Sequence, residues 1–208
     1  MINPLSGKNW AHRHSGEFRV KFIKVLLNAN CIDFVRNHGY ILGMKDEYFM
    51  KLCLKETMAA FDKEEVPVGA VIVSQDNEII SKAHNLTIHT NKATAHAEIL
   101  AIEEASKVLN NYRLTGCTLF VSKEPCIMCA GAIIEARIRR VVFGCFDSKR
   151  GAFGSVLDVS KLPLNHKLEV RGGVLKEKSE ALLKRFFQMR RGTEAVITGP
   201  TRNRLYAR

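Results

Sequence analysis

Two short segments, His96-Ala97-Glu98 and Pro125-Cys126-Ile127-Met128-Cys129, constrain the fold of this chain more than any other feature. His96, Cys126 and Cys129 can all bind zinc, although Pro125 follows His96 by 29 positions. A fold that uses all three must therefore bring the two segments together around one ion. Structural zinc sites are usually closed by four protein ligands, whereas catalytic sites keep the fourth position for water. Three ligands and a spare carboxylate, Glu98, indicate an open, hydrolytic site.

The spacing within each segment suits these roles. Residues three apart on a helix share a face, so Cys126 and Cys129 can both point at one metal ion. Pro125 suits the entry to that helix, and the positive N-terminus of the helix favours thiolate. Glu98 lies two positions from His96, so it points elsewhere and can reach a bound water without becoming a ligand. A Cys-x-x-Cys on its own is more often a structural zinc knuckle or two buried thiols than part of a catalytic site. The additional His-x-Glu segment makes the catalytic site the better interpretation.

The hydrophobic pattern predicts alternating helices and strands. Apolar residues at helical spacing predict a helix over residues 46–63, and Thr94 is a suitable N-cap for a helix over residues 95–107. Two strands flank the turn at Asp76-Asn77. The remaining elements are helices over 126–136 and 176–191 and strands over 68–73, 78–83, 118–122, 140–144 and 167–170. Strands alternating with helices predict an α/β sandwich whose helices cover a central sheet.

The positive charge is concentrated at the two ends of the chain. The net charge is +11, of which residues 1–43 carry +4 and residues 184–208 carry +6, leaving +1 for the middle. Clustered Lys and Arg favour a polyanionic partner such as nucleic acid, although a solvated basic tail has the same composition. We expect residues 1–43 to be an N-terminal extension outside the catalytic domain, with Met44 as an alternative start. Residues 44–192 form that domain, and 193–208 a flexible basic tail.

Two further features bear on location. No run of apolar residues approaches the roughly 18 that a membrane span needs, so we expect no membrane association. The chain has six cysteines, no secretory signal, and a Cys-x-x-Cys of the ligand type, which argues against a disulfide framework. A reducing cytoplasm fits this composition.

Both zinc segments together match the signature of zinc-dependent nucleobase deaminases, and more of the chain resembles the bacterial tRNA-specific adenosine deaminases. The resemblance spans about residues 44–192. It implies a three-layer α/β/α sandwich around a mixed, five-stranded sheet, as in cytidine deaminases. It rests on Glu65-Val66-Pro67-Val68-Gly69-Ala70-Val71, Ala93 to Glu98, Asn111-Tyr112-Arg113-Leu114, Glu124 to Ala132, Arg139 to Gly144, Asp147 to Ser155, Asn165-His166 and Phe186-Phe187-Gln188-Met189-Arg190-Arg191.

The same resemblance implies an activity. It is the hydrolytic deamination of adenosine to inosine at the wobble, or first anticodon, position of a tRNA, by a zinc-activated water that attacks adenine C6. His96, Cys126 and Cys129 would hold one Zn²⁺ per subunit, and Glu98 would be the catalytic residue that carries the proton. The resemblance further implies a homodimer that binds the anticodon stem-loop.

Five more positions are implied to bind substrate. Asn85 and the backbone of Ala97 would hold the edge of the base, and the loop of Asp147 would shape the pocket and contact flanking nucleotides. Arg190 and Arg191 are candidates for phosphate contact. Without the resemblance, Asn85 is a turn residue, Asp147 an ordinary loop acid, and the arginines a solvated helix end.

Other readings remain open at this point. The closest alternative is a deaminase of free cytosine, guanine or their nucleosides, and a more distant one is a noncatalytic zinc-stabilised RNA-binding subunit. The presence of Glu98 argues against the latter. We expect Phe186 and Phe187 to be core residues of an amphipathic helix, and His84, His89 and His166 to be surface or loop histidines instead of metal ligands.

Overall fold

The computed structural model describes the backbone of residues 38–197 and the side chains of residues 45–191. Most of the predicted N-terminal extension and the end of the predicted basic tail lie outside these ranges. The description below concerns the unit that begins at Met44.

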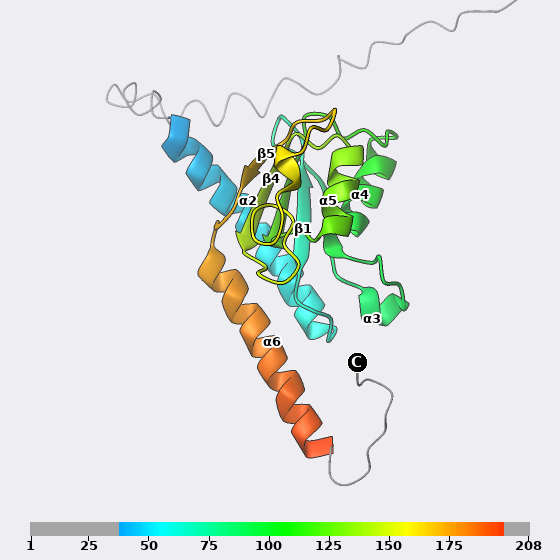
Figure 1. The fold of residues 1–208 in the computed structure, drawn as a ribbon, viewed down its shortest axis with the longest axis vertical. Coiled ribbons are helices and arrows are strands. Elements are labelled where there is room, and N and C mark those ends of the chain that lie inside the picture. The colour runs from blue at the N-terminus through cyan, green and yellow to red at the C-terminus, as the bar shows by residue number, and fades with distance from the viewer. Residues whose placement is uncertain (1–37, 198–208) are drawn as a thin grey trace, which may run out of the picture. The chain divides into compact units, whose positions relative to one another are not determined.

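A mixed sheet of five strands forms the centre of the domain (Figure 1). The strand order is β2-β1-β3-β4-β5; β1 pairs antiparallel with both β2 and β3, whereas β3-β4 and β4-β5 are parallel. The sequence therefore predicted the number of strands and the mixed character of the sheet correctly. The bounds are β1 (Gly69–Val73), β2 (Ile79–His84), β3 (Thr118–Lys123), β4 (Arg140–Cys145) and β5 (Glu169–Arg171).

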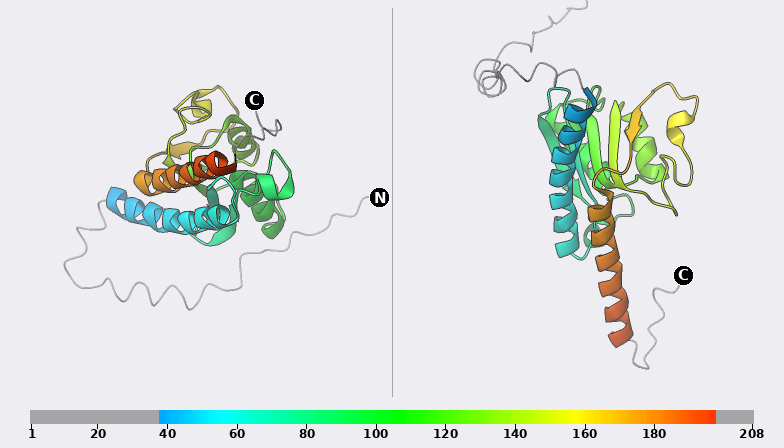
Figure 2. Two further views of the ribbon diagram at one scale, coloured as in Figure 1. Left: turned by 90° about the horizontal axis from the view of Figure 1, so that it is seen from below. Right: turned by 90° about the vertical axis from the view of Figure 1, so that its left-hand side faces the viewer.

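Helices cover both faces of this sheet, which confirms the three-layer α/β/α sandwich (Figure 2). Helices α2 (His38–Asp62) and α6 (Lys176–Ile197) cover one face, and α4 (Ala97–Val108) and α5 (Ile127–Glu135) cover the other. None of the helices in the described part of the chain is long and apolar enough to cross a membrane. Two short elements were not predicted, namely α3 (Thr87–Thr90) and the 3₁₀-helix η1 (Val159–Lys161).

The ends of three helices differ from the sequence prediction. Helix α2 begins before residue 46, and α6 continues past residue 191, so that residues 193–197 of the predicted tail are helical. Thr94 as an N-cap is wrong, because α4 begins at Ala97 and its N-cap is His96. The cap comes from far away in the sequence: the Asn85 Oδ1 accepts the Ala97 N–H at 2.9 Å.

The two sides of the sheet contribute to two separate hydrophobic clusters. Along β1, Ala70 and Ile72 belong to the cluster under α4 and α5, whereas Val71 and Val73 belong to the cluster under α2. This is the period of two that a strand imposes on its side chains. All five residues of β1 are buried, as expected for a central strand with helices on both faces.

Gly69 shows how closely α2 approaches the sheet. A Cβ atom at this position would lie 2.5 Å from the Cys53 carbonyl oxygen and 2.6 Å from the Thr57 nitrogen. Any side chain here would push the helix away from β1. The Cys53 thiol uses this proximity and donates a hydrogen bond of 2.9 Å to the Gly69 carbonyl.

A buried ion pair connects α2 to strands β4 and β5. The Arg140 guanidinium donates two hydrogen bonds to the Asp46 carboxylate, of 2.7 and 2.9 Å, and one of 2.9 Å to Glu169. Arg171 donates a further bond of 2.6 Å to Asp46. Asp46 and Arg140 are only 2% and 5% exposed, so each charge is stabilised by the other instead of by water.

We therefore expect Asp46→Ala to lower the free energy of unfolding by about 3 kcal/mol or more, because the buried Arg140 would keep only Glu169 as a charged partner. Urea denaturation followed by circular dichroism measures this loss. The control is Glu104→Ala, which breaks an exposed pair with Lys107 and should cost less than about 1 kcal/mol. Equal losses in the two variants would contradict a stabilising role for the Asp46-Arg140 pair.

Candidate active site

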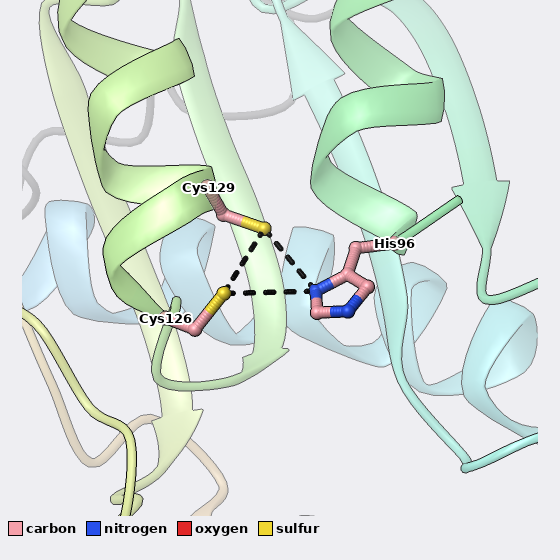
Figure 3. A group of neighbouring side chains, drawn as sticks. All are labelled: His96, Cys126 and Cys129. Carbon is pink, nitrogen blue, oxygen red and sulfur yellow. Dashed lines mark hydrogen bonds between the residues drawn. The ribbon is translucent and has the colours of Figure 1, made fainter. Parts of the chain in front are cut away.

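The predicted zinc ligands lie at the edge of the sheet where the parallel strands β3 and β4 end. Strand β3 ends at Lys123 and leads into α5, and β4 ends at Cys145 and leads into a loop over residues 146–158. Helix α4 begins at the same edge (Figure 3). In α/β proteins this edge, outside the carboxyl ends of parallel strands, is the usual place for ligands.

His96, Cys126 and Cys129 form a compact cluster (Figure 3). The two sulfurs are 3.7 Å apart, and the His96 Nδ1 lies 3.7 Å from Cys126 Sγ and 3.4 Å from Cys129 Sγ. Tetrahedral zinc with ordinary bond lengths would separate the sulfurs by about 3.8 Å and each sulfur from the nitrogen by about 3.6 Å. The three ligand atoms therefore fit a tetrahedral zinc ion that has one position left for a non-protein ligand.

The protonation of the two thiols also points to a cation. The hydrogen bond with Cys129 and, to a lesser extent, the one with His96 lower the pKa of Cys126 to about 3, although burial raises it. The hydrogen bond with Cys126 and then burial raise the pKa of Cys129. Two adjacent thiolates are thus unfavourable unless a metal cation lies between them. Cys126 is the N-cap of α5, where the helix dipole also favours a thiolate.

Glu98 belongs to the same site without belonging to the ligand cluster. Its side chain lines the pocket beside His96 and Cys126, and the residue is only 3% exposed. Burial raises the pKa of Glu98, since a carboxylate loses its hydration there. A raised pKa makes this carboxyl group a better proton carrier than an exposed glutamate, whose carboxylate is the weaker base.

Beside these residues is a pocket of about 190 Å³. Its lining combines acidic residues with only two that are permanently cationic, Lys123 and Arg150. Val66, Val68 and Ile88 add apolar surface on the side of β1 and α3.

Asn85 and Ala97, the two predicted base contacts, are bonded to each other. Asn85 is 7% exposed and lines the pocket, where its Oδ1 accepts the Ala97 N–H at 2.9 Å and its Nδ2 donates to the Val66 carbonyl at 3.0 Å. This pair fixes the start of α4 against the loop before β1. One amide hydrogen of Asn85 and the second lone pair of its oxygen have further capacity, so the contact with a base stays a prediction.

Glu124 is a residue of the site that sequence reasoning did not single out. Its buried carboxylate accepts backbone N–H bonds from Asp147 at 3.0 Å, Phe153 at 2.9 Å and Ser155 at 3.1 Å, and the Ser155 hydroxyl donates a fourth. Gly151 lies so close that a Cβ there would overlap the Glu124 carboxylate. Glu124 therefore holds the loop over 147–155 against the Cys-x-x-Cys turn. No local pattern signals this role, because its partners follow 23 to 31 positions later.

The Asp147 carboxylate is used within the protein. Its Oδ1 accepts the backbone N–H groups of Lys149 and Arg150 at 3.1 and 3.3 Å, and its Oδ2 lies 2.6 Å from the Lys123 ammonium. Burial alone would raise the pKa of Asp147, but the Lys123 hydrogen bond and the backbone donors lower it. Asp147 lines the pocket, so the structure brings it to the site, and its contact with substrate stays a prediction.

Arg190 and Arg191 lie on the part of α6 that continues past the sheet edge where α4 and α5 begin (Figure 1). Arg190 donates to the Glu64 carbonyl at 3.0 Å and its guanidinium lies 5.5 Å from the centre of the Phe186 ring. Arg191 lines a second hollow, of about 380 Å³, together with Lys149, Lys184 and Phe187. Lys149 of this hollow and Arg150 of the zinc pocket are neighbours in the same loop.

The prediction that Phe187 is a core residue is wrong, and none of the three other predicted histidines belongs to the ligand cluster. Phe186 is 6% exposed, as expected for a core residue, whereas Phe187, the next residue on the helix, points away from the core and is 44% exposed. Of these three histidines, His89 is exposed and His166 bonds to the Ile138 carbonyl, whereas His84 is the half-buried last residue of β2 and bonds to Glu56.

Comparison with known proteins agrees with this geometry. The profile of the cytidine and deoxycytidylate deaminase zinc-binding region matches residues 44–145. A guanine deaminase structure from Nitrosomonas europaea superposes with a TM-score of 0.57 at 26% identity, over 67% of this chain and 83% of that one. Fold and ligand set thus define the class: zinc-binding deaminases with the cytidine deaminase type of sandwich.

Several relatives narrow this class. The chain is 46% identical to the tRNA-specific adenosine deaminase of Bacillus subtilis over 69% of this chain and 89% of that protein, and 49% identical to that of Aquifex aeolicus over 70% and 95%. A structure from a study of A-to-I editing by tRNA:A34 deaminases has a TM-score of 0.63 at 42% identity, over 65% of this chain and 99% of that one. The chain belongs to the family of tRNA-specific adenosine deaminases.

The ligand cluster can be tested by metal content. We expect the wild-type protein to hold one zinc per chain, and Cys129→Ala to hold far less, because two ligands cannot replace the chelation of three. Inductively coupled plasma mass spectrometry on dialysed protein measures this. Cys117→Ala is the matched control, since Cys117 is buried outside the cluster and its loss should leave the zinc content unchanged. Full zinc occupancy of Cys129→Ala would rule out the assigned ligand set.

Proposed function

We propose that this protein hydrolyses adenosine to inosine at the first anticodon position of a tRNA, with release of ammonia. The observation that carries the proposal is its 46% to 49% identity with tRNA-specific adenosine deaminases across about nine-tenths of their length. The site supports the same reaction, because it combines a three-ligand cluster with a buried carboxyl group in one pocket. Homology to the guanine deaminase is weaker, at 26% identity.

In this proposal each residue of the site has a defined task. His96, Cys126 and Cys129 hold zinc, which when bound acts as a Lewis acid and lowers the pKa of water to about 7. Glu98 takes a proton from the attacking water and gives it to N1 of the adenine as the bond between the water oxygen and C6 forms. It then takes the proton of the new C6 hydroxyl and gives it to the amino group, which leaves as ammonia when the C6–N bond breaks. The pocket is partly enclosed, which strengthens these polar interactions by keeping bulk water out.

The surface around the pocket suits an RNA substrate. Lys149, Lys184 and Arg191 surround the second hollow, and the exposed ring of Phe187 lies among them. Basic side chains that interleave with an exposed aromatic ring are the usual means of binding single-stranded nucleic acid. We include Arg190 and Arg191, the Asp147 loop, Asn85 and Ala97 in the substrate-binding surface, and the anticodon stem-loop as the part of the tRNA that is bound.

Assembly and location complete the proposal. A homodimer is proposed from the family resemblance, and a cytoplasmic protein from the tRNA substrate. The five cysteines in the described part of the chain are all free, which is compatible with a reducing compartment.

Glu98→Gln should separate zinc binding from catalysis. The substitution keeps the size of the side chain and removes its ability to move protons, so we expect one zinc per chain and a loss of kcat of at least about 10²-fold. Inosine formation in an anticodon stem-loop with a wobble adenosine provides the assay. The variant Glu104→Gln, on the exposed face of the same helix, serves as control. Activity in Glu98→Gln close to that of the control would remove Glu98 from the mechanism.

The substrate class can be tested by the dependence of activity on salt. We expect kcat/KM for the stem-loop to fall at least about 10-fold between roughly 50 and 200 mM salt, because several phosphate contacts release counterions. The double variant Lys184→Gln/Arg191→Gln should flatten this dependence, whereas Lys82→Gln, an exposed residue that lines neither hollow, should not. Free adenosine, guanine and cytidine are assayed in parallel. Turnover of a free base or nucleoside with no reaction on the stem-loop would favour the alternative activity.

A further inference from the structure

Lys123 occupies a position in the zinc pocket that no assigned role explains. It is the last residue of β3, three positions before Cys126, and its side chain is 27% exposed and lines the pocket. Its ammonium lies 2.6 Å from the Oδ2 of Asp147, which also lines the pocket. An ammonium group has three N–H donors, and this contact uses one of them.

Asp147 has less capacity to meet a substrate than Lys123. The Asp147 carboxylate already accepts two backbone N–H bonds and the Lys123 contact, and its side chain is 10% exposed. The pair therefore presents its cation to the pocket and keeps its anion against the loop. The side chain that can reach a bound molecule is the lysine.

The acidic residues of the pocket indicate why a cation is needed there. Glu65, Glu98, Glu124 and Asp147 are four acidic residues in the lining, and an RNA strand that delivers a base to Glu98 brings phosphates towards them. Each phosphate near the mouth of the pocket would be repelled unless a basic group faced it. The permanent cations in the lining are Lys123 and Arg150, and only Lys123 is fixed by a short contact to the pocket wall.

We propose that Lys123 binds a phosphate oxygen next to the target adenosine, and that Asp147 is the positioning residue that aims it. This inference rests on the proposed function, because it assigns a contact within the RNA substrate. The Lys123 ammonium donates one hydrogen bond to Asp147 and another to the phosphate, so the ion pair stays intact when RNA binds. The contact orients the nucleotide so that its base enters the pocket beside Glu98.

The first experiment compares kcat/KM for the anticodon stem-loop in three proteins. Lys123→Met should lower it about 10-fold or more, because a charge-assisted contact is lost. The double variant Lys123→Met/Asp147→Asn should show the same loss, although it leaves no unpaired carboxylate behind. Recovery of wild-type kcat/KM in the double variant would mean that Lys123 only neutralises Asp147, and would overturn the proposal. Zinc content and the unfolding temperature confirm that each protein is intact.

The second experiment removes the charge from the RNA instead of the protein. Stem-loops carry a neutral methylphosphonate at the linkage on the 5′ or the 3′ side of the target adenosine. At one of the two linkages we expect about a 10-fold loss with the wild-type protein and almost none with Lys123→Met, since the same contact cannot be lost twice. Equal losses in both proteins at both linkages would show that Lys123 touches neither phosphate.

The two experiments also separate this inference from the proposed function. If the wild-type protein forms no inosine in the unmodified stem-loop, the proposed function fails and the assignment of Lys123 fails with it. If the wild-type protein is active and Lys123→Met has the same kcat/KM, only the assignment of Lys123 is wrong. The control Lys82→Met changes an exposed lysine of β2 outside the pocket and should match the wild type in every assay.

Discussion

The convergence of two helix N-termini at one edge of the sheet is the constraint on which the site depends. His96 and Cys126 are both N-caps, with nearly equal backbone angles of −75° and 151° and of −76° and 172°. Because an N-cap residue has left the helix geometry, its side chain can turn across the end of the helix. The helices α4 and α5 pack on the same face of the sheet through fully buried alanines at 97, 101, 105 and 130, and such small side chains permit a close approach. The distances of 3.4 to 3.7 Å between ligand atoms follow from this packing.

A second constraint links the metal site to the substrate wall. Glu124 precedes the Cys-x-x-Cys segment and binds the loop over 147–155, while the Ala152 N–H donates to the Pro125 carbonyl at 2.9 Å. Cys126 also forms an isolated β-bridge with Gly151. The loop that shapes the pocket is therefore held by the same turn that supplies two zinc ligands. Movement of either wall would be opposed by buried hydrogen bonds, which suits a site that must hold reacting groups in fixed positions.

The sequence predicted those features whose cause is local. The period of two in β1, the three-residue spacing of Cys126 and Cys129, and the alternation of helices and strands all arise between near neighbours. The features that it missed depend on partners far along the chain. Thr94 looked like a cap because Ser and Thr usually cap their own helix, yet Asn85 supplies the bond across 12 positions. The contact between Lys123 and Asp147 crosses 24 positions, and no periodic pattern relates residues so far apart.

The distribution of charge reconciles proton transfer with the binding of a polyanion. In the proposed mechanism Glu98 transfers protons, and burial raises its pKa, whereas a neighbouring cation favours the charged carboxylate and acts in the opposite direction. Lys123, one of the two cations in the lining of the pocket, is paired with Asp147, whose negative charge partly offsets its field. Three further basic residues, Lys149, Lys184 and Arg191, line the second hollow. The pocket lining is thus more acidic than basic, with four carboxylates and two cations, while the basic residues of the second hollow suit the attraction of RNA.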